Sequence, residues 1–145
     1  MPTNLDLNLG SGGSVLDLST LTLTDLMIDG ASGSSTIALP NGNYAVEYDS
    51  ASGSSLLTLP ENGQIDMKID SGSGSMEIIL PASMQAYIEV DGGSGGWRVD
   101  SSRLELVSQD GNDSVWQTAD YNEAGANRLY LELDGGSGSI LFVSE

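Results

Sequence analysis

The chain has 145 residues, enough for one domain with a substantial hydrophobic core. It contains no cysteine and no histidine, which excludes disulfides, thiolate metal sites and thiol nucleophiles and removes the commonest general base. Its 21 acidic and four basic residues give a net charge of −17, which repels nucleic-acid phosphates and anionic membrane surfaces. Cations and basic proteins are the partners that this charge permits.

The chain enters a strand pattern almost at once, at Leu5. The residues before it lack the basic and apolar segments of an export signal, and no apolar run reaches the ~18 residues of a membrane span. We therefore expect a domain of a longer protein, in which any anchor or signal lies upstream of Met1.

Short segments of glycine and serine punctuate the chain at regular intervals. When the segments are aligned, each has a glycine at the same position, and these glycines are Gly12, Gly33, Gly53, Gly74, Gly95 and Gly138. The intervals are 21, 20, 21, 21 and 43 residues, and the last corresponds to two units with one degenerate copy. Proline recurs seven residues after the shared glycine, at Pro40, Pro60 and Pro81. A sequence repeat of about 21 residues follows from this spacing.

Apolar residues alternate with polar ones on both sides of each glycine turn. The alternating runs, in chain order, are residues 14–18, 35–39, 44–48, 55–59, 65–69, 76–80, 86–90, 97–99, 129–133 and 140–142. A period of two predicts strands with one buried face, and no run has helical periodicity. Each repeat is therefore a strand, a Gly/Ser turn, a second strand and a Pro or Asn-Gly turn.

One such repeat cannot bury its apolar face alone, but stacked copies can. We predict an all-β, single-domain β-solenoid over residues 1–145, with about seven rungs of ~21 residues in two stacked parallel sheets. The crossover rule favours a right-handed coil.

Stacking in chain order makes specific predictions about neighbouring side chains. Glu47 and Glu89 should flank Lys68 on the solvent face, and Glu77 should lie beside Arg98. Trp97 falls at an inward position and should belong to the core.

Residues 103–128 interrupt the pattern. They predict either an irregular rung whose loop covers the side or end of the stack, or a binding loop on a rigid scaffold. The aromatic residues expected to form an interaction surface are Trp116, Tyr121, Tyr87 and Tyr130. Tyr87 and Tyr130 need not touch, because the degenerate copy separates their repeats. The alternative is that these rings pack beneath the 103–128 segment.

A row of aspartates precedes the glycine turns, at Asp29, Asp49, Asp70, Asp91 and Asp134. Stacked at one corner, they are the weak metal-site candidates of the chain, and carboxylates with turn carbonyls suit Ca²⁺. In calcium-binding nonapeptide repeats, however, Asp follows the glycines, whereas here it precedes them. The simpler interpretation is that each Asp accepts hydrogen bonds from the backbone of its own turn.

The repeat resembles the toast-rack family of predicted bacterial adhesins, and it is similar to the C-terminal domains of membrane-associated cell-envelope stress proteins that respond to cell-wall antibiotics. The segments that carry the resemblance are residues 7–13, the Asp-Gly-x-Ser-Gly turns and residues 121–139. The resemblance implies a β-helix-like stack, an extracytoplasmic setting and often an upstream membrane anchor. It implies no catalytic residues.

Two functions of different classes follow. The first is a non-catalytic extracytoplasmic scaffold or protein-interaction domain, adhesin-like, of a bacterial envelope protein that associates with itself or a partner through solenoid ends or edges. The alternative is a calcium-dependent surface or polysaccharide-binding module that uses the Asp row. An enzyme is disfavoured, because the serines lack a partner to activate them and four cationic residues leave little to stabilise developing charge. No cofactor is expected apart from Ca²⁺ in the alternative.

Overall fold

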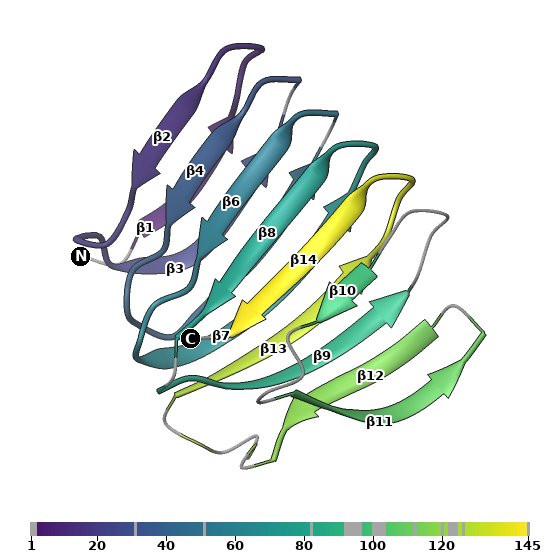
Figure 1. The fold of residues 1–145 in the computed structure, drawn as a ribbon. Coiled ribbons are helices and arrows are strands. Elements are labelled where there is room, and N and C mark those ends of the chain that lie inside the picture. The colour runs from purple at the N-terminus through teal and green to yellow at the C-terminus, as the bar shows by residue number, and fades with distance from the viewer. Residues whose placement is uncertain are drawn as a thin grey trace.

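The structure is a computed structural model that describes residues 3–30, 32–50, 52–81, 83–91, 97–99, 104–111, 113–119, 121, 125 and 127–144. Strands form two sheets, which lie against each other as the two layers of a stack (Figure 1). No helix is present among the described residues. The all-β prediction with two layers of mostly parallel strands is confirmed. The turn glycine Gly95 and the side chain of Trp97 lie outside the described residues, so the inward position expected for Trp97 stays a prediction.

The larger sheet, sheet A, has eight strands. Their spatial order is β1 (Thr3–Asn8), β3 (Leu23–Asp29), β5 (Tyr44–Ser50), β7 (Gly63–Ser71), β13 (Asn127–Asp134), β9 (Gln85–Asp91), β12 (Asp113–Thr118) and β11 (Leu104–Asp110). The smaller sheet, sheet B, has six strands. Their order is β10 (Trp97–Val99), β14 (Ser139–Ser144), β8 (Ser75–Leu80), β6 (Ser54–Thr58), β4 (Ser35–Ala38) and β2 (Ser14–Asp17). We call a strand of sheet A, its Gly/Ser turn and the following strand of sheet B a rung.

The shared glycines of the turns form a column, as the repeat predicts. A methyl group placed on Gly53 would collide with the carbonyl oxygen of Gly33, and one on Gly74 would collide with that of Gly53. Gly138 stands in the same relation to Gly74. Backbones approach this closely only where no side chain intervenes, so glycine at this phase of the repeat is what allows successive rungs to stack.

The core lies between the two sheets and consists of the inward residues of the alternating runs. On sheet A the fully buried side chains include Ile65, Ile88 and Leu131, and on sheet B they include Ile78 and Phe142. Their burial alternates with exposure along each strand, as in β5 and β7. This is the one-sided burial that a period of two predicts.

Near the N-terminal end the core contains a polar group whose hydrogen bonds are satisfied internally. The hydroxyl of Tyr48 lies 2.7 Å from the Ser55 hydroxyl and 3.1 Å from that of Ser35. Ser35 and Tyr48 are both buried. Ser35 and Ser55, which point inward, therefore satisfy the hydrogen bonding of the buried tyrosine hydroxyl. In the next rung the residue paired with Ser55 is the apolar Met76.

The order of the rungs differs from the prediction. The C-terminal strands β13 and β14 do not extend the stack at its end but insert between earlier rungs, β13 between β7 and β9 and β14 between β8 and β10 (Figure 1). Glu132 therefore takes the place predicted for Glu89 beside Lys68, with Glu47 on the other side. Leu141 likewise separates Glu77 from Arg98. Both predictions of neighbours that assumed chain order are wrong in this respect.

The described part of the irregular segment forms a hairpin of β11 and β12 in sheet A rather than a rung that crosses both sheets. Strand β12 pairs antiparallel with β9, and β11 pairs antiparallel with β12. The hairpin extends sheet A beyond the last strand of sheet B. The hairpin therefore forms the last two strands of sheet A, and the interpretation of residues 103–128 as a covering or a binding loop stays a prediction.

Candidate functional site

The outer face of sheet A carries a ladder of aspartates at the corner where the Gly/Ser turns begin. Strand register makes neighbours of Asn8, Asp29, Asp49, Asp70, Asp134, Asp91, Asp113 and Asp110, in that spatial order. The predicted row is thus present, but Asp134 stands between Asp70 and Asp91 because β13 inserts there. Asp113 and Asp110 extend the ladder, although their turn is out of phase with the repeat and the sequence gives no sign that they belong to it.

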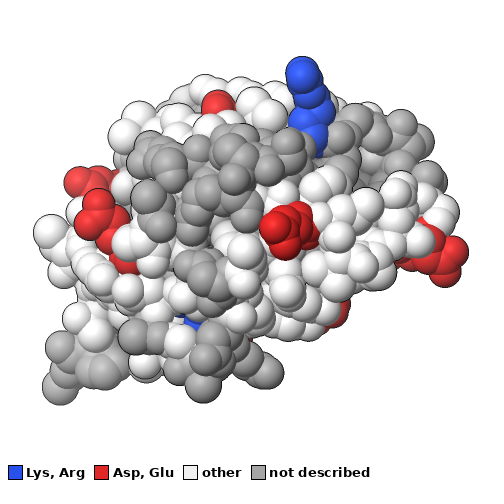
Figure 2. All heavy atoms as spheres, turned by 60° about the horizontal axis from the view of Figure 1, so that its bottom comes forward, with Lys and Arg blue, Asp and Glu red and all other residues white. Residues whose placement is uncertain are grey.

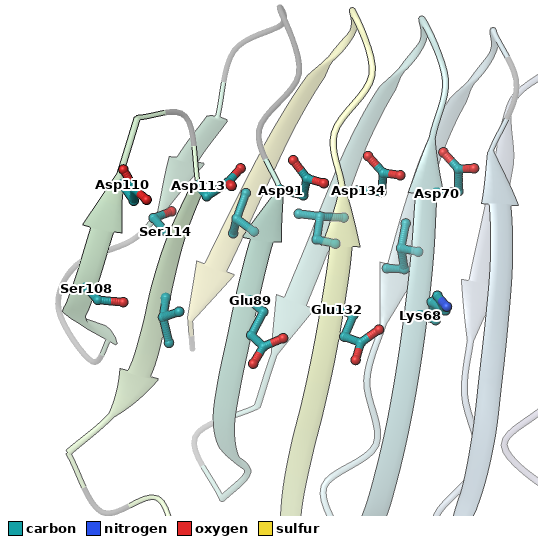
Figure 3. A pocket seen from close by; sticks show the side chains of 14 residues that line it. Lys68, Asp70, Glu89, Asp91, Ser108, Asp110, Asp113, Ser114, Glu132 and Asp134 are labelled. Carbon is teal, nitrogen blue, oxygen red and sulfur yellow. The ribbon is translucent and has the colours of Figure 1, made fainter.

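Beside the ladder, sheet A and the hairpin form an open groove of about 560 Å³. Figure 3 shows Lys68, Glu89 and Glu132 along one side and the aspartates along the other, from neighbouring strands. The carboxylates lie side by side along the strands and do not converge on one point (Figure 3). Among the described residues, no three acidic side chains are grouped so that they could hold a metal ion.

Mutual repulsion and burial change the acidity of this ladder. Burial, and then the charges of Asp134 and Asp49, raise the pKa of Asp70. A hydrogen bond to Asp113 and the charges of Asp113 and Asp134 raise the pKa of Asp91. Stacked like charges disfavour ionisation of one another, so the ladder opposes folding electrostatically at neutral pH.

A cluster of three tyrosines lies on the same outer face. The rings of Tyr87 and Tyr130 are stacked, with centroids 5.3 Å apart and an interplanar angle of 11°. Tyr121, after the hairpin, is tilted against Tyr87 at 5.5 Å. The expectation that Tyr87 and Tyr130 need not touch is wrong, since the insertion of β13 makes their strands neighbours.

The tyrosine cluster is half-buried and hydrogen-bonded. The Tyr130 hydroxyl donates to a Glu89 carboxylate oxygen at 3.1 Å. Burial and this carboxylate raise the pKa of Tyr130 to about 12. Trp116 lies elsewhere, half-buried against the hydrophobic core with its indole N–H donating to Ser114 Oγ at 3.0 Å. The predicted aromatic surface therefore divides into three outer tyrosines and one tryptophan at the end of the core.

The inserted strand β13 is held to β7 by contacts that periodicity did not reveal. Arg128 forms an ion pair with Asp66 at 2.6 Å. The Gln64 side-chain amide donates to the Gly125 carbonyl oxygen at 2.7 Å, and the Gly63 N–H donates to Asn127 Oδ1 at 3.1 Å. These contacts lie on the outer face of sheet A and at the turns that precede β7 and β13, away from the buried positions of the repeat.

The N-terminal end of the stack is a second candidate surface. Leu5, Leu7, Leu9 and Leu16 pack on the core but remain half-buried. In the next rung the residues paired with Leu5 and Leu7 are Leu26 and Ile28, which are 2% and 1% exposed. Among the described residues, no strand pairs with the outer edge of β1 or β2.

Comparison with known families agrees with this architecture. Residues 1–59 match the family described as the N-terminal domain of toast_rack, DUF2154. The match covers the N-terminal 59 of the 145 residues, so over that part the chain is similar to toast-rack domains. The matched region spans the first rungs, including the open end and the first glycines of the column. The predicted family resemblance is thereby confirmed.

This similarity is consistent with an extracellular scaffold or interaction domain. No curated protein and no solved structure matches the chain. In the part of the chain that the structure describes, no helix is long and apolar enough to cross a membrane. On the face shown in Figure 2, acidic side chains are spread over the surface, in keeping with the net charge of −17.

Proposed function

We propose that this chain is a toast-rack domain that serves as a non-catalytic, adhesin-like scaffold or protein-interaction domain on the extracytoplasmic side of a bacterial envelope. It acts as part of a longer anchored or exported protein, and its stack is a right-handed coil of about seven repeat units. The observation that carries the proposal is the N-terminal end, where the core side chains are only half-buried and the edges of both sheets are unpaired among the described residues.

A surface of this kind is suited to binding a partner. Unpaired strand edges offer rows of N–H and C=O groups, which is the chemistry of strand addition between proteins. Apolar side chains beside those edges lose contact with water when a partner covers them, which favours association. Neither feature requires a reactive side chain.

A non-catalytic role is also supported by how the acidic side chains are arranged. Acid–base catalysis by carboxylates needs two of them in opposed environments facing one reacting bond. In the ladder the pKa values of Asp70 and Asp91 are both raised, and the carboxylates stand in a row. Such a row repeats the same charge, and no pair within it is divided into a general acid and a general base.

Calcium-dependent binding through the aspartate ladder remains the alternative. Its support is the accumulation of carboxylates along one edge of the groove. A melting curve in calcium against chelator separates the two functions, because a bound ion stabilises the folded state in proportion to the logarithm of its concentration. A rise of many degrees in calcium favours the alternative, and coincident curves favour the scaffold.

The scaffold proposal is tested by cross-linking in cells. A photoreactive residue is introduced at Val15, on the N-terminal edge and 83% exposed, in the full-length protein of its native bacterium. Val107, 53% exposed on the hairpin, is the matched control position. We expect discrete protein adducts from Val15 and few from Val107. Equal or absent adducts from both positions would contradict the proposal.

A further inference from the structure

The two ends of the stack differ in shape, and the difference determines what can dock on each. At the N-terminal end, β1 and β2 belong to one rung, so both sheets stop at the same level. At the other end, sheet A continues past β9 with β12 and β11, whereas in the part of the chain that the structure describes the last strand of sheet B is β10. The N-terminal end is flush, and the far end is stepped by two strands.

The backbone of the flush end presents free hydrogen-bonding groups on both sheets. Directly after β1 the Leu9 N–H donates to Asp29 O, and at the start of β2 the Ser14 N–H donates to Ser34 O. Successive residues of a strand point their backbone groups to opposite sides. The N–H groups of Asp6 in β1 and Val15 in β2 therefore face away from the stack.

The flush end also carries little charge. Residues 1–24 contain two acidic residues, Asp6 and Asp17, and no basic ones, so the remaining 121 residues carry 19 of the 21 acids. A basic partner would be attracted to the acidic outer face of sheet A rather than to this end. A partner of the same low charge meets little repulsion here, even when the rest of its surface is acidic.

The interior of the stack shows what fits against a rung. A methyl group on each described glycine of the column after Gly12 would meet the neighbouring turn on the N-terminal side of the stack, whereas one on Gly12 would meet nothing within 4 Å. An occupant must bring two strand edges separated by the ~10 Å spacing of packed sheets. A second flush end meets that requirement, whereas the stepped end does not, because its two edges lie at different levels.

From these features we infer that two copies of this domain associate flush end to flush end through a twofold axis. Strands β1 and β2 of each copy extend the two sheets of the other, and the half-buried leucines of both copies close into one core. The contact is isologous, so it closes at a dimer, and the stepped far ends prevent growth into a filament. The inference rests on the proposed function and names its partner, a second copy of this chain.

The test is the mass of the purified chain in solution, by light scattering or sedimentation over a wide concentration range. We expect a concentration-dependent dimer of the 15.0 kDa chain. Asp6→Pro removes an N–H from the free edge of β1 without removing a bond to β3, and proline is tolerated at such positions. It should weaken the dimer about tenfold or more, as expected for loss of about 1.4 kcal/mol of edge pairing.

Val15→Lys and Val107→Lys form a matched pair that does not depend on proline. Both replace an exposed valine with lysine, the first on the flush edge and the second on the hairpin. A lysine on an edge strand opposes edge-to-edge pairing, so Val15→Lys should shift the chain to monomer and Val107→Lys should leave the dimer unchanged. Far-ultraviolet circular dichroism confirms that each variant is folded.

A wild-type chain that stays monomeric, or a dimer that Val107→Lys weakens as much as Val15→Lys, overturns the inference. Higher oligomers that grow with concentration also overturn it, since a flush twofold contact cannot propagate. In-cell adducts from position 15 to a different protein, together with a monomer in solution, would leave the scaffold function standing and reject the second copy as its partner.

Discussion

Replacing Gly53 with alanine tests whether the glycine column holds the rungs in contact. The added methyl would collide with the Gly33 carbonyl oxygen and lie 2.7 Å from its carbon. Non-bonded carbons rest about 3.5–4.0 Å apart, so the two turns must separate by roughly 1 Å. The atoms that would have to move are backbone, which cannot rotate away as the end of a side chain can.

The separation carries an energetic cost that can be estimated from the corner it disrupts. Between these rungs the Gly30 N–H donates to Asp49 O at 2.7 Å, and an added 1 Å breaks such a bond. Two or three lost backbone bonds at about 1 kcal/mol each give a destabilisation of about 3 kcal/mol. For a chain of this length that corresponds to a fall of roughly 6–12 °C in melting temperature.

The assay is thermal and urea unfolding followed by circular dichroism, at a concentration where the chain is monomeric. Gly12→Ala is the matched control, because its methyl would meet nothing within 4 Å. It should change the free energy of unfolding by less than about 0.5 kcal/mol. Gly33→Ala should fall between the two, since its methyl meets the end rung, which can fray. Equal stability of Gly53→Ala and Gly12→Ala would refute the stacked column.

Three further predictions concern charge, ionisation and packing. Asp91→Asn should raise the melting temperature at neutral pH and low salt. The pKa of Asp91 is raised in the folded state, so the ionised carboxylate present at neutral pH destabilises the fold, and asparagine removes that charge. Asp17→Asn should lower the melting temperature at neutral pH, because hydrogen bonds from Ser19 lower the pKa of Asp17 and so stabilise the folded state until the pH falls through the lowered pKa. If both substitutions shifted the melting temperature in the same direction, one of the two pKa directions would be wrong. In ultraviolet titration, Tyr130→Phe should remove the tyrosine component that ionises near pH 12. The stability of the wild-type chain should fall as the pH rises from about 10, the pKa of an unfolded tyrosine, towards the folded pKa of about 12. Leu131→Ala, at a fully buried position, should cost about 2–5 kcal/mol, while Leu141→Ala, 39% exposed, should cost far less in the same denaturant titration.

Much of the fold could be predicted because the relevant signals are local. The alternation in residues 44–48 and 65–69 identifies the buried face of each strand, and the glycines at one phase identify the turns. Stacking in register then follows, because the turns of neighbouring rungs can approach closely only where a glycine of one turn faces a glycine of the next, as Gly53 faces Gly33. The aspartate row follows from the same register.

The groove and the tyrosine cluster could not be predicted, because both depend on which rungs are neighbours. Tyr87 and Tyr130 stack only because β13 lies against β9. The ladder reaches Asp113 only because the hairpin pairs antiparallel with β9. Aspartate spacing in the sequence contains no sign of either event.

Periodicity by itself determined the register of this protein: which residues point inward, which form the turns and which stand in rows. It left the order of the rungs open, because rungs with the same pattern of inward residues can pair with one another in more than one order. Only the tertiary structure decided that order, through contacts outside the repeat such as the ion pair of Arg128 with Asp66 and the stacking of Tyr130 on Tyr87. Those contacts hold β13 in its inserted place, and the stepped far end comes from the hairpin that pairs with β9.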